Sequence, residues 1–274
     1  MTLIISELSP LGIVMVADNA ITFDCYAPNG TFKGRSFKGL TKLLPVAKIQ
    51  AGLSYWGWAN VCPYGDINKG IPFDWWLSNF LMVNDDKFDN LEDLANLLET
   101  ELRKIIPKID ENPLSYGGIH LAGFSQYKGN LIPDFWHIHN GASQALSAKQ
   151  IDSLIVNANH DCPVKKTVEF FSKGMFYMTR NGELEIFIPL FDSLNEYIRE
   201  EFHKYDFITP IPNVLARADY YKSQLQLLST LYQISGKIEH TKTSSVIYEV
   251  PVSVSNEVTI LTISKGRINN YFTS

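Results

Sequence analysis

The hydrophobic residues of this chain change their spacing along the sequence, and the order of these changes restricts the fold. Short apolar and β-branched runs typical of strands come first, and residues 73–105 then carry apolar positions at helical spacing. Strand patterns return from residue 119, a second helical stretch follows, and strand patterns come last. The order strands, two helices, strands, two helices, strands predicts the α+β class, with antiparallel sheets packed together and helix pairs outside.

The first strands are predicted by two short apolar runs. Residues 3–5 and 13–17 are rich in aliphatic residues, and Pro10-Leu11-Gly12 between them predicts a tight turn. Residues 21–41, rich in Gly, Phe and Lys, are expected to be irregular, and a third strand is expected over residues 43–51. The sequence is therefore expected to begin in a hairpin.

The helices are predicted from apolar residues that recur at i, i+3, i+4 and i+7. They cover residues 73–81, 91–105, 191–202 and 214–232, with Asn90 as the expected N-cap of the second. Further strands are predicted over residues 119–124, 135–139, 175–187, 246–254, 258–263 and 268–272, with Asn181-Gly182 as a turn. No low-complexity linker divides these elements, so we expect a single domain over residues 1–274.

Charge and composition exclude nucleic acid and membrane partners. The net charge is −5, and Lys and Arg do not cluster beyond pairs, so the sequence has no basic surface for phosphates. It has no apolar run of about 18 residues, the length that a membrane-spanning helix needs. Residues 1–17 lack Lys and Arg and are read as mature protein. Three widely spaced cysteines (Cys25, Cys62 and Cys162) indicate a reducing cytoplasm.

His137 and His139 are a possible metal-binding pair. They alternate on one face of a predicted strand, and His160 and Cys162 follow not far along the chain. No third ligand with a recognisable spacing follows, so we expect ordinary surface or half-buried histidines. No metal and no cofactor are expected.

Thr2 is the candidate nucleophile of a hydrolytic site. An N-terminal threonine supplies two catalytic groups, because its hydroxyl attacks an amide and its own α-amine, with an ordinary pKa of about 7.7–8.0, acts as the base. The small side chain of Thr2 favours removal of Met1, and a strand from Leu3 would hold the chain end in place. Many cytoplasmic proteins begin with Met-Thr and do not use the threonine in catalysis, so the function depends on the sequence that follows Thr2.

The sequence after Thr2 resembles the opening of proteasome β-type subunits and their bacterial relatives, which are N-terminal-nucleophile hydrolases. The similarity lies in a glycine, an apolar strand and an Ala-Asp pair over residues 12–18, in Thr22, and in Lys42 before a strand that ends in Ala-Gly. It is specific over about residues 2–57. The resemblance implies a four-layer αββα sandwich of two antiparallel sheets and a cytoplasmic homo-oligomer, a ring or a related assembly.

The resemblance also implies roles for two charged residues. Asp18 and Lys42 would lie beside Thr2; Lys42 would raise the local positive potential so that the hydroxyl loses its proton more easily, and Asp18 would orient Lys42. Lys33 and Lys38 are the alternatives for the lysine position. A structural salt bridge is the alternative for the pair.

The substrate in this interpretation is a peptide or a protein. Thr22 would hold the substrate backbone, and a backbone N–H near Ser54 and Tyr55 would receive the oxyanion of the tetrahedral intermediate. Tyr55 and Trp56 would narrow the pocket.

Two other functions stay open. That family supports its threonine with a Gly-Ser-Gly stretch and with a later aspartate and serine. This sequence has no recognisable counterpart of either, and it has Ala20 where an arginine is common. These differences favour a catalytically silent assembly or binding subunit. A narrow pocket favours an amidase or acylase that acts on small molecules.

Overall fold

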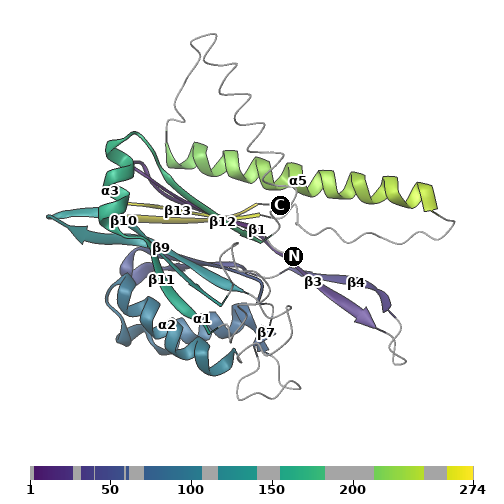
Figure 1. The fold of residues 1–274 in the computed structure, drawn as a ribbon, viewed down its shortest axis with the longest axis horizontal. Coiled ribbons are helices and arrows are strands. Elements are labelled where there is room, and N and C mark those ends of the chain that lie inside the picture. The colour runs from purple at the N-terminus through teal and green to yellow at the C-terminus, as the bar shows by residue number, and fades with distance from the viewer. Residues whose placement is uncertain are drawn as a thin grey trace, which may run out of the picture.

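Two five-stranded antiparallel sheets form the framework of the chain (Figure 1). The computed structural model describes residues 3–26, 32–39, 41–58, 60–61, 71–106, 117–140, 155–182, 213–243 and 258–273. Within these residues the sheets are accompanied by helices α1, α2, α3 and α5 and by two two-stranded hairpins. The α+β class is confirmed.

The first sheet has the strand order β12-β1-β2-β13-β14. Its strands are β1 (Leu3–Ser9), β2 (Gly12–Asp18), β12 (Tyr177–Gly182), β13 (Val258–Ser264) and β14 (Arg267–Thr273). Every residue of β1 and β2 is buried, because one face of the sheet packs on the second sheet and the other packs under α5 (Val214–Thr243). Alternate residues of β1 therefore enter two different cores.

The second sheet has the strand order β11-β10-β9-β6-β5. Its strands are β5 (Leu43–Val46), β6 (Ala51–Trp56), β9 (Gly118–Tyr127), β10 (Asn130–His139) and β11 (Asn157–Cys162). One face carries small and apolar residues toward the first sheet, among them Ala122, Phe135 and Cys162. The other face carries Leu53, Tyr55 and the residues that α1 and α2 cover.

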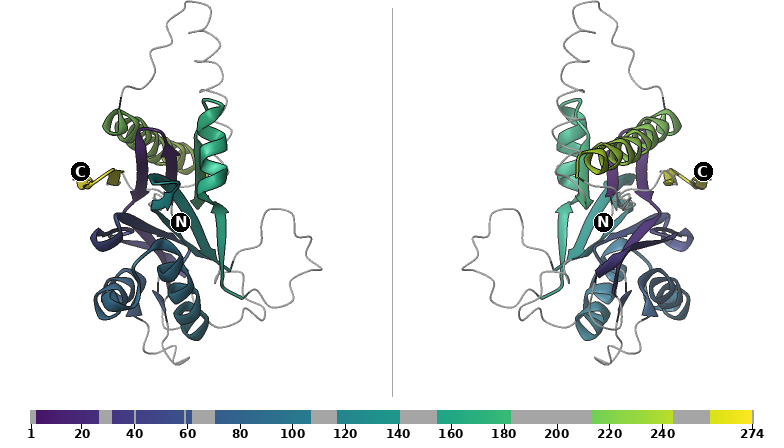
Figure 2. Two further views of the ribbon diagram at one scale, coloured as in Figure 1. Left: turned by 90° about the vertical axis from the view of Figure 1, so that its left-hand side faces the viewer. Right: turned by 90° about the vertical axis from the view of Figure 1, so that its right-hand side faces the viewer.

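The helices cover the outer faces of the two sheets. The α1 (Phe73–Val83) and α2 (Leu91–Ile105) helices pack on the second sheet, and α5 packs on β2 and β13 of the first. The views in Figure 2 separate α5 from the α1–α2 pair by the two sheets. Asn90 caps α2 as predicted, because its side chain accepts a hydrogen bond from the Asp93 N–H at 2.9 Å. No helix in this described part has the length and apolar character needed to cross a bilayer.

Several elements differ from the sequence prediction. The strand expected over residues 43–51 is two strands, β5 and β6, joined by a 3-10 turn (Ala47–Ile49) and by Gln50 in the left-handed region at φ 49°. The stretch expected to be irregular contains a hairpin of β3 (Ala20–Tyr26) and β4 (Phe32–Gly39), which projects from the sheets (Figure 1).

The turn expected at Asn181-Gly182 is also corrected. Both residues belong to β12 and pair with Ile4 and Leu3 of β1, so the local Asn-Gly signal yields to strand pairing. The predicted helix over residues 191–202 and the predicted strand over residues 246–254 lie outside the described residues. The sequence prediction missed β7 (Asn60–Val61), β8 (Ile71–Pro72), β11 and α3 (Val164–Ser172).

Candidate active site

Asp18 joins the first two strands of the chain at one end of the first sheet. It is the last residue of β2, with Val258 of β13 opposite on one side and the start of β1 on the other. Its Oδ1 accepts a hydrogen bond from the backbone N–H of Leu3 at 2.8 Å, and its side chain is fully buried. A buried carboxylate needs such donors, because unpaired charge in a protein interior is costly.

Lys42 supplies the opposite charge from the second sheet. It precedes β5, and its Nζ donates to Asp18 Oδ1 at 3.1 Å, with both side chains at 0% exposure. Burial lowers the pKa of Lys42, and the nearby Asp18 carboxylate partly offsets this effect. One carboxylate oxygen therefore receives both the Leu3 amide and the Lys42 ammonium.

Thr2 lies outside the described residues, but the peptide bond to Leu3 connects it to the Asp18–Lys42 pair. It is bonded to the Leu3 nitrogen, the same N–H that donates to Asp18. Thr22 lies in β3, where its backbone is opposite Phe37 of β4, and its side chain is outside the described part. Lys33 and Lys38 lie in β4, with their side chains also outside it.

Ser54 and Tyr55 lie on β6, next to Lys42, and both are buried, but their side chains face different cores. The Tyr55 ring packs edge-on against Phe73 of α1 at 4.8 Å, and strand alternation directs Ser54 toward the first sheet. The backbone N–H of Tyr55 donates to the Lys42 carbonyl at 3.2 Å, so this expected oxyanion donor is already engaged. Among the described residues, neither Ser54 Oγ nor Tyr55 Oη has a hydrogen-bond partner.

The environment of Tyr55 keeps its hydroxyl protonated. Burial raises the pKa of this side chain, and the carboxylates of Asp74 and Asp18 raise it further. Asp74 is held at the start of α1, where it accepts from the Thr41 N–H at 3.4 Å, next to Lys42. The Tyr55 hydroxyl is therefore a donor without a described acceptor.

Sequence reasoning missed His120, which connects the two sheets next to this end. It lies on β9 with both ring nitrogens hydrogen-bonded, Nδ1 to Ser6 Oγ of β1 at 2.9 Å and Nε2 to Asn181 Oδ1 of β12 at 2.7 Å. Burial lowers its pKa, and neighbouring His137 lowers it further. The available signal was a histidine inside the otherwise apolar run Ile119-His120-Leu121.

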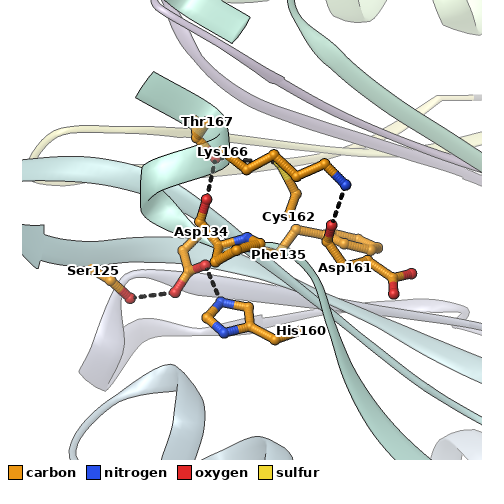
Figure 3. A network of polar contacts seen from close by, with 9 residues as sticks. Ser125, Asp134, Phe135, His160, Asp161, Cys162, Lys166 and Thr167 are labelled. Carbon is orange, nitrogen blue, oxygen red and sulfur yellow. Dashed lines mark hydrogen bonds and ion pairs between the residues drawn. The ribbon is translucent and has the colours of Figure 1, made fainter. Parts of the chain in front are cut away.

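A second polar network lies on β10 and β11, away from Asp18 (Figure 3). Asp134 Oδ1 is 2.6 Å from His160 Nε2, and Asp134 Oδ2 accepts from Ser125 Oγ at 2.7 Å. The serine hydroxyl thus meets the carboxylate rather than the imidazole, so these three residues do not form a serine–histidine–aspartate relay. In the part that the structure describes, no three His, Cys, Asp or Glu side chains form a group suited to a metal ion.

Comparisons with known proteins give only weak likenesses. No protein-family model matches this sequence, and no curated protein matches it. The chain is similar to the solved structure of Anbu (ancestral beta-subunit) from Yersinia bercovieri, with 12% identity and a TM-score of 0.46, covering 99% of this chain and 88% of that one. An Anbu (Gly-1) mutant from Hyphomicrobium sp. strain MC1 gives 11% identity and a TM-score of 0.47, covering 100% and 88%. Similarity at this level establishes neither a family nor an activity.

These findings correct the family expected from the resemblance. The pattern around Asp18 and Thr22 indicated a proteasome β-type subunit of the N-terminal-nucleophile hydrolases, yet no family model matches, and the two Anbu structures are 12% and 11% identical to this chain. That prediction was wrong. Aliphatic residues dominate buried strands of many folds, so an apolar strand that ends in aspartate is not specific. The homo-oligomer and the cytoplasmic location stay predictions.

Proposed function

We propose that the chain is an amide hydrolase in which Thr2, exposed by removal of Met1, is the nucleophile. The observation that carries the proposal is the buried Asp18 carboxylate, whose Oδ1 holds both the Leu3 N–H at 2.8 Å and Lys42 Nζ at 3.1 Å. A fully buried ion pair next to the start of β1 has a structural cost, since desolvation of two charges offsets much of their attraction. A catalytic use of the pair explains its position.

In this mechanism the Thr2 hydroxyl attacks the amide carbon while its α-amine accepts the hydroxyl proton. The protonated amine then gives a proton to the departing amine of the substrate, and an ester to Thr2 remains. Water attacks the ester with the same α-amine as base, which releases the acid and restores the hydroxyl. Lys42 supplies positive potential near the forming alkoxide, and Asp18 fixes Lys42 and the Leu3 amide.

The substrate that we propose is a peptide or a protein, bound next to β6. Thr22 is the proposed contact to its backbone, and the Ser54 hydroxyl, which faces the first sheet and lacks a partner among the described residues, is a further candidate to contact it. The cores on the outer faces of both sheets support a four-layer αββα arrangement in one domain, which we include in the proposal.

A peptide epoxyketone followed by intact-mass measurement tests the proposal. This electrophile needs both the hydroxyl and the free amine of an N-terminal threonine, so we expect a mass that lacks Met1 and carries one adduct. Thr2→Ser keeps both groups and should keep the adduct, whereas Thr2→Ala should lose it. A folded protein without Met1 that never forms the adduct would contradict the proposal.

A silent binding subunit is the second candidate, and one observation favours it. The Tyr55 N–H, expected to receive the oxyanion, donates to the Lys42 carbonyl instead. In that case Asp18 and Lys42 form a structural salt bridge, and Thr2→Ala changes neither binding nor stability. The mass measurement separates the two candidates, because the silent subunit gives no adduct even after loss of Met1.

A further inference from the structure

Trp56 and His137 form a side-chain hydrogen bond that crosses a whole strand. Trp56 lies at the end of β6, His137 lies on β10, and the indole Nε1–H donates to His137 Nε2 at 3.3 Å. The strand between them is β9, where Gly118 pairs with both Trp56 and His139. Because Gly118 has no side chain, the indole passes over β9 and reaches the second strand along.

The space over Gly118 is filled by this contact. A Cβ atom at position 118 would lie 2.7 Å from Trp56 Nε1 and 3.0 Å from His137 Nε2, the two atoms that form the bond. Both belong to rigid rings, which cannot move one atom aside as a flexible chain end can. An alanine at this position would therefore separate the two rings.

The hydrogen bond requires a neutral His137. An indole N–H only donates, so the Nε2 atom that faces it must accept and cannot carry a proton. A protonated imidazole has N–H groups at both nitrogens and would set donor against donor. Protonation of His137 and the bond to Trp56 exclude each other.

A partner for the protonated form is already present on the other side of the ring. Asp161 of β11 places Oδ2 3.6 Å from His137 Nδ1. A carboxylate at this distance gives the Nδ1–H an ion-pair partner when the ring is protonated. The same ring thus has a neutral state bonded to Trp56 and a charged state paired with Asp161.

Two other histidines of the second sheet, His120 and His139, lie beside His137. The His120 ring is 5.0 Å away between centroids, but its nitrogens are both engaged and burial lowers its pKa. The His139 ring is 4.1 Å away, and its Nε2 is 2.8 Å from Asn159 Nδ2. Lys166 of α3 donates to the backbone carbonyl of Asp161 at 2.8 Å. Tyr177 of β12 packs on Phe135, whose ring lies beside that of His137.

We propose that the contact between His137 and Trp56, which we call the latch, is controlled by pH. Protonation of the His137 ring breaks its hydrogen bond to the indole, turns the ring to Asp161, and releases the end of β6. The neighbouring residue Tyr55 donates to the Lys42 carbonyl, so the release acts on the strand that borders the Asp18–Lys42 pair. The latch goes beyond the proposed hydrolase and does not depend on Thr2.

The latch can be read directly from the indole N–H signals in an NMR spectrum of the full chain labelled with ¹⁵N-tryptophan. The sequence has 5 tryptophans, and Trp56→Phe assigns the relevant signal. Between about pH 8 and about pH 5, where histidine changes charge, we expect the Trp56 proton signal to move upfield as its hydrogen bond is lost. The other indole signals report whether the core stays folded.

Two substitutions separate the latch from a general effect of acid. His137→Gln offers an amide oxygen that accepts without titrating, so its Trp56 signal should stay at the bonded position throughout. Gly118→Ala should place the signal at the unbonded position even at about pH 8. His139→Gln is the matched control and should titrate as the natural chain does. A Trp56 signal that does not move with acid, or that moves equally in His137→Gln, would overturn the proposal.

Discussion

At the residue scale, His120 is a buried neutral base whose hydrogen bonds connect both sheets. Ser6 and Asn181 belong to β1 and β12, while His120 belongs to β9 of the other sheet. Burial lowers its pKa well below the usual range, so the folded chain leaves the ring uncharged where the unfolded chain would protonate it. The difference in proton uptake makes stability depend on pH.

The sign of that dependence follows from linkage. Above about pH 6.5 the ring is neutral in both states and contributes no pH dependence; below it the unfolded chain binds a proton that the folded chain lacks. We therefore expect the free energy of unfolding to decrease as the pH is lowered below about 6.5, with a limiting slope of about 1.4 kcal/mol per pH unit from this residue. Urea unfolding of the natural chain and of His120→Gln, at several pH values, measures the difference. Equal slopes in the two proteins would contradict the assignment.

The residues of the candidate site were partly within reach of sequence reasoning. The resemblance singled out Asp18 and Lys42, and the structure places Asp18 Oδ1 3.1 Å from Lys42 Nζ. Their roles stay predictions. The Tyr55 N–H was out of reach, because its engagement depends on the β5–β6 turn, and that turn was read as continuous strand.

At the scale of elements, the spacing of apolar residues predicted the helices and strands in which that spacing is regular. The α1 and α2 helices and β1 and β2 were predicted because their apolar spacing is regular. The β11 strand reads Asn-Ala-Asn-His-Asp-Cys and has no apolar alternation to detect, and α3 is a short helix of 9 residues that buries only Thr167. Their pairing and packing come from contacts with β10 that are distant in sequence.

The α5 helix is attached to the first sheet by a buried charged cluster. Glu7 of β1 is fully buried and faces α5, where the Arg217 guanidinium and the Tyr221 hydroxyl bond its carboxylate. Arg217 and Tyr221 are four residues apart and so share one helix face. Arg217 also lies over the Phe176 ring, 4.7 Å from its centroid.

Removal of one partner from this cluster should be severe. Arg217→Met leaves the Glu7 charge buried, and we expect a loss of about 3–5 kcal/mol in the free energy of unfolding. Adding Glu7→Gln should restore much of the loss, because the uncompensated charge is gone. Lys222→Met removes a charge from the same helix and is the control. Urea denaturation of these variants gives the comparison, and a double variant as unstable as Arg217→Met alone would argue against charge burial as the cause.

At the scale of the whole molecule, the two sheets pack so closely at Gly52 that a Cβ atom does not fit between them. A Cβ there would lie 2.2 Å from Leu261 Cδ2 and 2.8 Å from Met15 Sδ, which belong to β13 and β2 of the facing sheet. Both sheets are therefore as close as their side chains permit at this point, and the glycine of β6 sets the spacing.

Gly52→Ala should force the sheets apart or displace Leu261. We expect a cost of about 1–3 kcal/mol from overpacking. Leu261→Ala alone opens a cavity that costs about 2–5 kcal/mol. The two changes compensate in volume, so the double variant should be more stable than the sum of the single effects predicts. Denaturant titration of the four proteins tests this, and additive losses would show that the two positions do not share the contact.

The pairing of β2 with β13 joins two segments that are synthesised at very different times. β2 has β1 on one edge and β13 on the other, and Asp18 is opposite Val258. Residues near the start of the sequence therefore cannot complete their strand pairing until residues near its end have been synthesised. While the chain is being synthesised, the apolar strand β2 has an unpaired edge, which is a template for association with other chains. A ribosome that stalls before residue 258 would therefore release a product that is prone to aggregate and in which Asp18 and Lys42 lack the strand that covers them.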